Sequence, residues 1–321
     1  MKIALVTPSI AGARSGNQHT AERWAKFLRR GGHRVSVAMH WDGKAVDVLI
    51  ALHARRSYSS IERFHAAYPG APLIVVLTGT DLYRDIKTHP EARRALELAS
   101  RLVVLQPEGR LELPRRLRAK TRAVFQSADV SASHKPPTKL FRLAVVGHLR
   151  EEKDPFRAVT ALAHLPHRPD LEVIHLGKPL TPAMRKEAGL WMARDSRYRW
   201  LDSQPHGQAL RRLANSNLLI VSSVMEGGAN VICEAARIGV PVLASRVSGN
   251  IGMLGRGYPG YFALFDDRAL ARLIERAADD PKFYRMLKNA VRSRRRLFAP
   301  AAERDGLRRL LREFAPARSV S

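Results

Sequence analysis

Short apolar runs alternate with longer amphipathic segments along nearly the whole chain. In the first half, runs rich in branched aliphatic residues fall at 2–7, 34–38, 46–52, 73–77 and 102–105. Between them, residues 20–30 and 61–68 carry apolar side chains at helical spacing. This alternation predicts parallel strands connected by crossover helices.

The second half repeats the pattern. Strand patterns occur at 142–147, 171–176, 217–223 and 241–245, and helical patterns at 156–165, 208–215 and 231–238. The tail from Asp279 to Phe314 is helical and basic, with Pro281 placed to open one helix and Pro300 to separate it from the last. The polar stretch 131–138 contains two prolines and no periodicity, which is typical of a linker.

We therefore predict an α/β protein built from two Rossmann-like, doubly wound parallel-sheet domains. The first domain spans 1–134, the second spans 135–298, and residues 299–321 form a C-terminal helix that could cross back to the first domain. Ligands of such sheets bind at the carboxyl ends of the strands, so we expect the two domains to face an interdomain cleft.

Composition adds one unusual feature, a formal net charge of +26 from 55 Lys and Arg against 29 Asp and Glu in 321 residues. The excess is divided evenly between the two halves. A nucleic-acid module clusters its charge, so arginine-rich codon usage explains this excess better than polyanion binding does. We expect neither a nucleic acid nor a membrane as partner.

The single cysteine, Cys233, permits no intramolecular disulfide, which favours a reducing compartment. The apolar run at the start of the chain stops at Thr7-Pro8, short of a signal peptide, and no run reaches the length of a membrane span. These features predict a cytoplasmic protein.

Residues 222–235 leave a strand pattern, pass two glycines and enter a helix pattern. Backbone N–H groups at such a helix start can hold a phosphate or sugar oxygen. Glu226 and Glu234 lie eight positions apart, and their carboxylates can accept hydrogen bonds from vicinal hydroxyls at two points of an extended ligand. The alternative is that both glutamates only complement the helix dipole.

A second motif follows the strand that ends at Gly147. Arg150 and Lys153 lie three positions apart on the loop before the next helix. Two such cations suit a diphosphate whose leaving-group charge must be neutralised. The alternative is a solvated charge run, because Glu151 and Glu152 lie between them.

In order and spacing, these motifs resemble the nucleotide-binding half of GT-B glycosyltransferases of family 4. The similarity covers most of 141–280 and includes Gly-x-Leu-Arg-x-x-Lys, Glu-x7-Glu and a later Gly-Val-Pro-Val. By this resemblance Arg150 and Lys153 bind the donor diphosphate, Glu226 contacts the sugar hydroxyls and Glu234 contacts the ribose. The backbone of the first motif would line the donor at Gly227, Gly228, Ala229 and Asn230, and Gly147 of the second motif would also contact the donor.

The first half resembles the acceptor domain of the same family, with departures. His53 stands where many members keep a histidine close to the reacting carbon, although a structural, hydrogen-bonded histidine is the alternative. The family's usual His-Gly-Thr-Asp is Thr78-Gly79-Thr80-Asp81 here, and its usual Asn-Gly is replaced near Gln126. These losses argue against an ordinary hydroxyl acceptor.

The departures resemble one subgroup, the selenosugar synthases of selenoneine biosynthesis, over nearly the whole chain. The resemblance implies transfer of a sugar from UDP-N-acetylglucosamine or UDP-glucose to the selenium of selenophosphate. Selenium is already a strong nucleophile, so positive charge and hydrogen-bond donors matter more at the acceptor site than a general base. We expect these from Gly16, Asn17, Arg55, Arg56 and Thr80.

No metal or other cofactor is expected, and the UDP-sugar enters as a substrate. The acidic pairs Asp266-Asp267 and Asp279-Asp280 fall at predicted helix ends, so helix capping explains them without a metal ion. Cys233 falls on the apolar side of a predicted helix, which favours a core position over a nucleophile. Two other functions stay open at this stage. One is a family 4 transferase with a hydroxyl acceptor, and the other is a non-catalytic binder of nucleotide-sugars or nucleic acid.

Overall fold

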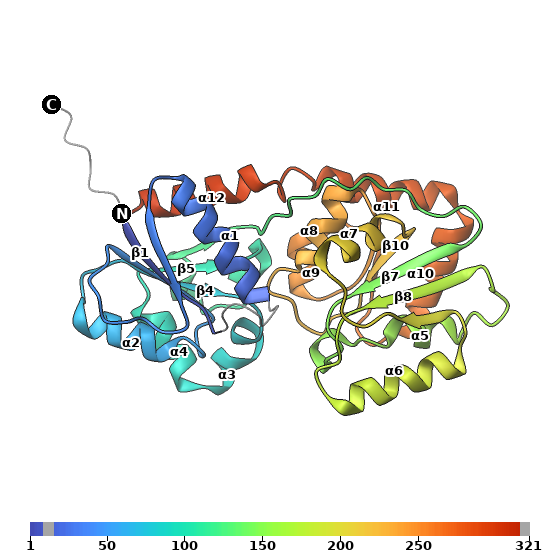
Figure 1. The fold of residues 1–321 in the computed structure, drawn as a ribbon, viewed down its shortest axis with the longest axis horizontal. Coiled ribbons are helices and arrows are strands. Elements are labelled where there is room, and N and C mark those ends of the chain that lie inside the picture. The colour runs from blue at the N-terminus through green and yellow to red at the C-terminus, as the bar shows by residue number, and fades with distance from the viewer. Residues whose placement is uncertain (9–15, 315–321) are drawn as a thin grey trace. The chain divides into compact units, whose positions relative to one another are not determined.

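The computed structural model describes residues 1–8 and 16–314 (Figure 1). Contacts between Cα atoms divide the chain into two compact units, residues 1–126 with the segment from Pro300 onward, and residues 127–299. Each unit contains one parallel six-stranded sheet with helices packed around it, so the predicted α/β class with doubly wound parallel sheets is confirmed. The chain leaves the first unit at Gln126, earlier than the boundary at 134 expected from the sequence.

The sheet of the first unit has the strand order β2-β1-β3-β4-β5-β6. Its strands are β1 (Lys2–Val6), β2 (Arg34–Ala38), β3 (Val48–Leu52), β4 (Leu73–Leu77), β5 (Arg101–Val104) and β6 (Thr121–Ala123). Its helices are α1 (Gly16–Arg30), α2 (Tyr58–Ala67), α3 (Ile86–Thr88), α4 (Pro90–Leu98) and α12 (Pro300–Arg312), with a π-helical turn, η1 (Asp81–Asp85), before α3. The first five strands match the predicted segments to within two residues at each end.

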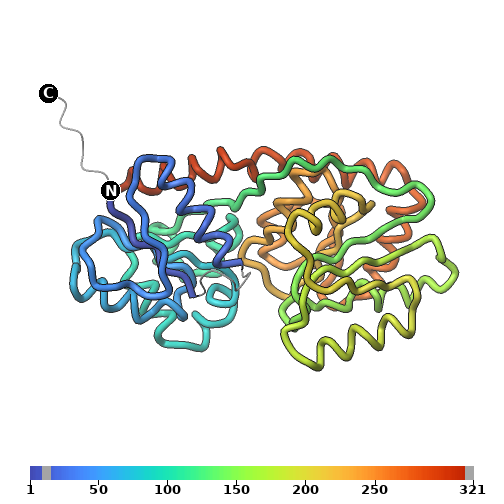
Figure 2. Tube along the Cα trace, in the orientation of Figure 1, coloured from blue at the N-terminus to red at the C-terminus, as the bar shows by residue number. Residues whose placement is uncertain are grey.

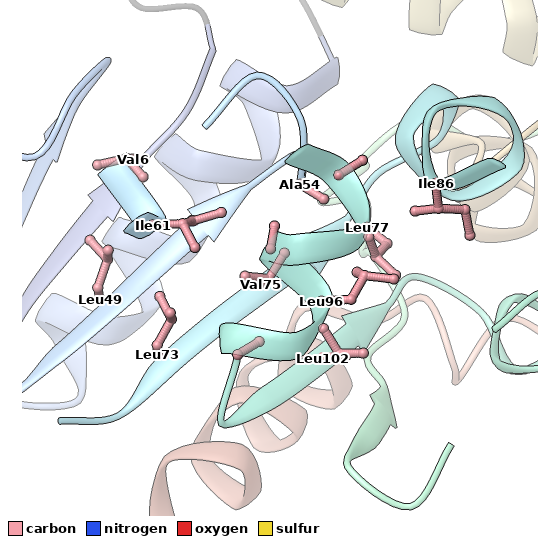
Figure 3. Close-up of a cluster of buried hydrophobic side chains, with 14 of the residues drawn as sticks. Val6, Leu49, Ala54, Ile61, Leu73, Val75, Leu77, Ile86, Leu96 and Leu102 are labelled. Carbon is pink, nitrogen blue, oxygen red and sulfur yellow. The ribbon is translucent and has the colours of Figure 1, made fainter. Parts of the chain in front are cut away.

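Alternate residues of the central strands point to opposite faces of the sheet and belong to two separate hydrophobic cores. Leu49, Val75 and Leu77 point to the face covered by α2 and α4, as Figure 3 shows. Ile50 and Val76, one position away, point to the opposite face, where α1 and α12 pack. This period-two division is the reason that strands β3 and β4 are apolar at every position.

The sheet of the second unit has the order β12-β11-β10-β7-β8-β9. Its strands are β7 (Phe141–Val146), β8 (Leu171–Leu176), β9 (Tyr198–Trp200), β10 (Leu218–Val221), β11 (Val242–Ser245) and β12 (Tyr261–Phe262). Its helices are α5 (Arg157–Leu162), α6 (Pro182–Arg194), α7 (His206–Ala214), α8 (Asn230–Ile238), α9 (Ser248–Leu254), α10 (Asp267–Asp279) and α11 (Pro281–Ser293). Strand β7 lies between β8 and β10, so the strand order reverses beside it, where ligands of open α/β sheets bind.

The predicted helix ends are confirmed. Asp266 caps α10 by accepting a hydrogen bond from the Ala269 N–H, and Asp280 caps α11, with Pro281 in its first turn. Cys233 is buried, as predicted for a core position.

The last helix, α12, belongs to the first unit and contacts α1. In Figure 2 these two helices are the red and the blue segments of this unit. A buried carboxylate fastens α12. Glu303 accepts hydrogen bonds from the Trp24 indole at 2.7 Å and from two nitrogens of Arg23 at 2.7 and 3.0 Å. The side chain of Glu303 is fully buried, so these donors take the place of water around its carboxylate.

Replacing Glu303 with alanine should lower the free energy of unfolding by about 2–4 kcal/mol, because a buried indole N–H and a guanidinium lose their acceptor. Urea unfolding followed by circular dichroism measures this change. Asp305→Ala on the same helix is the control, since its half-exposed carboxylate lies in surface ion pairs with Arg304 and Arg308. Equal effects of the two substitutions would contradict the anchoring role of Glu303.

Candidate active site

Two loops meet at the carboxyl ends of β7 and β10, within the second unit. We call residues 147–156 the β7 loop and residues 222–229 the β10 loop. Gly147 and Lys153 of the first and Ser223 and Glu226 of the second line one pocket, together with His175 at the end of β8. Three residues predicted for the donor site, Gly147, Lys153 and Glu226, are therefore neighbours in the structure.

An ion pair joins the two loops. Lys153 Nζ lies 2.5 Å from Glu226 Oε1, and the Ser223 hydroxyl donates to the same oxygen at 2.5 Å. The side chain of Glu226 is only 8% exposed and that of Lys153 23%, so neither charge is well solvated. No hydrogen bond to the second oxygen, Oε2, comes from the residues that the structure describes.

Buried polar groups hold the β10 loop from behind. The Ser245 hydroxyl donates to the Ser223 carbonyl at 2.6 Å, and the Asn250 amide donates to the Ser245 carbonyl at 3.0 Å. Gly249, in the first turn of α9, touches the Glu226 carbonyl so closely that a Cβ there would overlap it. The Glu226 backbone is thus held by groups that the loop itself does not contain.

The β7 loop is fastened to the β10 loop by a second set of bonds. The Ser222 hydroxyl donates to the carbonyls of Lys153 and Asp154 at 3.1 and 2.8 Å, and the Val224 N–H donates to the Glu152 carbonyl at 3.0 Å. Asp154 adopts a left-handed conformation, with φ of 44°, that ends the short helical turn containing Lys153. Lys153 therefore has a fixed backbone from which to reach Glu226.

A buried histidine underlies the β7 loop. His175 Nδ1 lies 2.9 Å from the Tyr198 hydroxyl, and its ring also bonds the backbone of Gly147. Burial lowers the pKa of His175 to about 4, an effect only partly opposed by the Gly147 bond. The ring is neutral at pH 7. Gly177, the residue after β8, packs against the Gly147 carbonyl, which a Cβ would overlap.

The other predicted donor residues belong to these two loops or to α8. Arg150 is half-buried and forms no ion pair with the residues that the structure describes, and it does not line the pocket. Gly227, Gly228 and Ala229 lead into α8, which starts at Asn230. The Asn230 side-chain oxygen is buried, and within the described chain no donor reaches it.

Glu234, inside α8, has a partner that the sequence did not indicate. His206 Nε2 of α7 lies 2.9 Å from Glu234 Oε1, and this bond raises the pKa of His206. The two residues are far apart in the sequence, so no motif links them. Glu234 is therefore engaged at one oxygen.

In the first unit, His53 follows β3 in a left-handed conformation, with φ of 73°. Its Nδ1 accepts the Arg56 N–H at 3.3 Å, which places the ring proton on Nε2, 3.1 Å from the Thr80 hydroxyl. Burial lowers the pKa of His53 against the opposing charge of Asp81. Both ring nitrogens are thus occupied, and His53 has no free nitrogen to act as a general base.

Two buried aspartates organise this cluster, and sequence reasoning did not identify them as site residues. Asp81 accepts the N–H groups of Ala54, Thr78 and Gly79 at 2.8–3.0 Å. Asp85, one helical turn later, is fully buried beside His53, and its Oδ2 lies 2.9 Å from Arg55 Nε. The only signal for Asp85 was its spacing of four from Asp81.

The remaining predicted acceptor residues differ in availability. Arg55 is held by Asp85 and by His89, whereas Arg56 is exposed and its side chain forms no hydrogen bond or ion pair with residues 1–8 and 16–314. Gly16 and Asn17 are the first residues of α1. The loop before them, 9–15, lies outside the described residues. Arg56 is therefore the one of these two arginines whose charge is not already balanced by a carboxylate.

Within residues 1–8 and 16–314, no group of three or more His, Cys, Asp or Glu side chains is arranged to hold a metal ion. Nor does any helix of these ranges have the length and apolarity needed to cross a bilayer.

Comparisons with known proteins agree with this architecture. Residues 126–294 match the sequence family described as Glycosyl transferases group 1. The chain is 30% identical over 187 residues to the D-inositol 3-phosphate glycosyltransferase of Corynebacterium efficiens, a match that covers 54% of this chain and 43% of that relative. The chain thus aligns with less than half of that relative's length.

Solved structures show the same fold at low sequence identity. HepE of Anabaena, solved with UDP and glucose, superposes with a TM-score of 0.78 at 17% identity and covers 98% of this chain and 100% of its own. Sucrose-phosphate synthase of Thermosynechococcus elongatus gives a TM-score of 0.77 at 17% identity, over 97% and 98% of the two chains.

The neutral state of His175 predicts a pH dependence of stability. Its pKa is about 4 in the folded chain and 6.5 when unperturbed, so between these values the unfolded state binds a proton that the folded state does not. The free energy of unfolding should fall as the pH drops through this interval, by about 3 kcal/mol from this residue.

His175→Asn keeps an acceptor for the Tyr198 hydroxyl and removes the titrating group. Urea unfolding at pH 7 and pH 4 should show a smaller pH-dependent loss in this variant than in the wild type. An unchanged loss would mean that His175 is not buried in the neutral form.

Proposed function

The chain belongs to the group 1 glycosyl transferases, and from this premise we propose that it transfers the sugar of a UDP-sugar to the selenium of selenophosphate. The observation that carries the donor half of the proposal is the Lys153–Glu226 pair at the carboxyl ends of β7 and β10. A cation for the diphosphate and a carboxylate for the sugar hydroxyls line one pocket there.

A uridine nucleotide is favoured by the structural relatives. HepE of Anabaena was solved with UDP and with UDP-glucose, and it has the fold of this chain. In the proposed reaction selenium forms a bond to the anomeric carbon while the bond from that carbon to the diphosphate oxygen breaks. The electron pair of the broken bond leaves with UDP, and Lys153 and Arg150 neutralise the charge that develops on it.

The acceptor half of the proposal is supported by His53 and Arg56. A hydroxyl acceptor needs a base to remove its proton, and both nitrogens of His53 are engaged. Selenophosphate is anionic before it reacts, so it needs positive charge rather than a base. The exposed Arg56 offers that charge.

Acceptor choice is tested by measuring UDP release from UDP-N-acetylglucosamine with selenophosphate, with inorganic phosphate and with inositol phosphate as separate acceptors. We expect selenophosphate to give the fastest turnover. Faster turnover with inositol phosphate, which offers hydroxyl groups, would contradict the selenophosphate proposal and favour a conventional hydroxyl acceptor. Binding of UDP-N-acetylglucosamine without turnover for all three acceptors would indicate a non-catalytic binder.

Lys153→Ala should lower kcat by about 10²–10³-fold, because the leaving diphosphate loses a preorganised positive charge. Lys186→Ala on the exposed face of α6 is the matched control and should retain wild-type kcat. Circular dichroism checks that both variants fold. Near-normal turnover by folded Lys153→Ala would place the donor diphosphate elsewhere.

A further inference from the structure

We propose that Arg157 is a positioning residue for the donor site, because its guanidinium holds the β7 loop in the conformation that presents Lys153. Arg157 is the first residue of α5, directly after that loop, and no sequence motif indicated a role for it. Arg157 does not line the pocket, so it acts through the loop backbone and not on a ligand. The inference rests on the proposed function, because it assumes that the pocket beside Lys153 receives the nucleotide donor.

The guanidinium of Arg157 joins the β7 loop to the segment after β12. Its Nε and Nη2 donate to the two carboxylate oxygens of Asp154 at 2.7 and 3.3 Å. Its Nη1 donates to the Phe265 carbonyl at 2.9 Å, and its Cζ lies 5.6 Å from the centre of the Phe265 ring. The side chains of Arg157 and Asp154 are 18% and 16% exposed, so water screens this ion pair less than it screens a surface pair.

Both residues that Arg157 binds have an unfavourable backbone conformation. Asp154 has a φ of 44° and Phe265 has a φ of 65°. The left-handed region is disfavoured for residues that carry a Cβ, so surrounding groups must maintain it. Asp154 also precedes Pro155, and a residue before proline prefers an extended backbone. Without its partners, Asp154 would therefore relax toward the extended conformation.

Such a change at Asp154 would reach Lys153 directly. The Asp154 N–H donates to the Glu151 carbonyl at 3.0 Å and closes the turn that contains Lys153. The Asp154 carbonyl accepts the Ser222 hydroxyl of the β10 loop at 2.8 Å. An extended Asp154 rotates the peptide groups on both of its sides, so these two bonds cannot both be kept. Lys153 then loses the fixed backbone from which it reaches the pocket.

The first test is isothermal titration of UDP into folded Arg157→Met, which keeps most of the aliphatic stem and removes the guanidinium. Its affinity for UDP should be about 5- to 30-fold lower than that of the wild type, the population shift expected when a left-handed residue other than glycine loses its support. Arg168→Met is the matched control. It breaks the Arg168–Asp170 pair just before β8, at the amino ends of the strands, and should leave UDP affinity unchanged.

Substitutions of Asp154 separate the backbone conformation from the loss of charge. Glycine adopts the left-handed region without strain and alanine does not, and neither side chain is charged. When added to Arg157→Met, Asp154→Gly should recover most of the lost UDP affinity, whereas Asp154→Ala should recover none. Equal affinities of the two double variants would overturn the inference, because a purely structural loss in α5 would not distinguish glycine from alanine.

A double-mutant cycle tests whether the effect passes through Lys153. Arg157→Met should change UDP affinity less in the Lys153→Ala background than in the wild type, and equal changes would contradict the positioning role. Circular dichroism checks that each variant folds. Wild-type affinity in folded Arg157→Met would overturn the inference and leave the proposed function in place.

A wild type that binds UDP without transferring sugar to selenophosphate would overturn the proposed acceptor, while the titrations would still decide the role of Arg157. Failure of the wild type to bind UDP would overturn the proposed function and the inference with it.

Discussion

The ion pair between Lys153 and Glu226 is the interaction on which the candidate donor site depends. Neither side chain is well solvated, so each charge is stabilised at its position by the other. The pair also fixes two loops that the sheet only brings near each other. Ser222 ties the backbone that carries Lys153, and Ser223 with Gly249 fixes the segment that carries Glu226.

The parallel sheet explains why these loops meet at all. Strands β7 and β10 are hydrogen-bonded neighbours although about 70 residues of chain separate them, so their carboxyl ends lie at one edge. The first unit uses the same edge of its own sheet differently. After β3 and β4 it buries Asp81 and Asp85 around His53, which fixes the histidine and leaves Arg56 exposed.

The central strands and the donor motifs could be predicted from sequence because their signal is local. A run such as 73–77 is apolar at every position, and Glu-x7-Glu is a fixed spacing. The short edge strands β6, β9 and β12 were missed, since two or three residues carry no periodicity and pairing with a neighbour defines them. Ser223, Asp85 and the His206–Glu234 contact were missed for a related reason. Their roles depend on side-chain direction and on partners distant in the sequence.

The central claim is that this protein transfers the sugar of a UDP-sugar to the selenium of selenophosphate and so forms a carbon–selenium bond. Mass spectrometry of the products formed by the wild-type protein from UDP-N-acetylglucosamine and selenophosphate tests it most directly. The account predicts UDP and an N-acetylhexosamine product with the isotope pattern of one selenium atom. Sugar products that contain no selenium would contradict it.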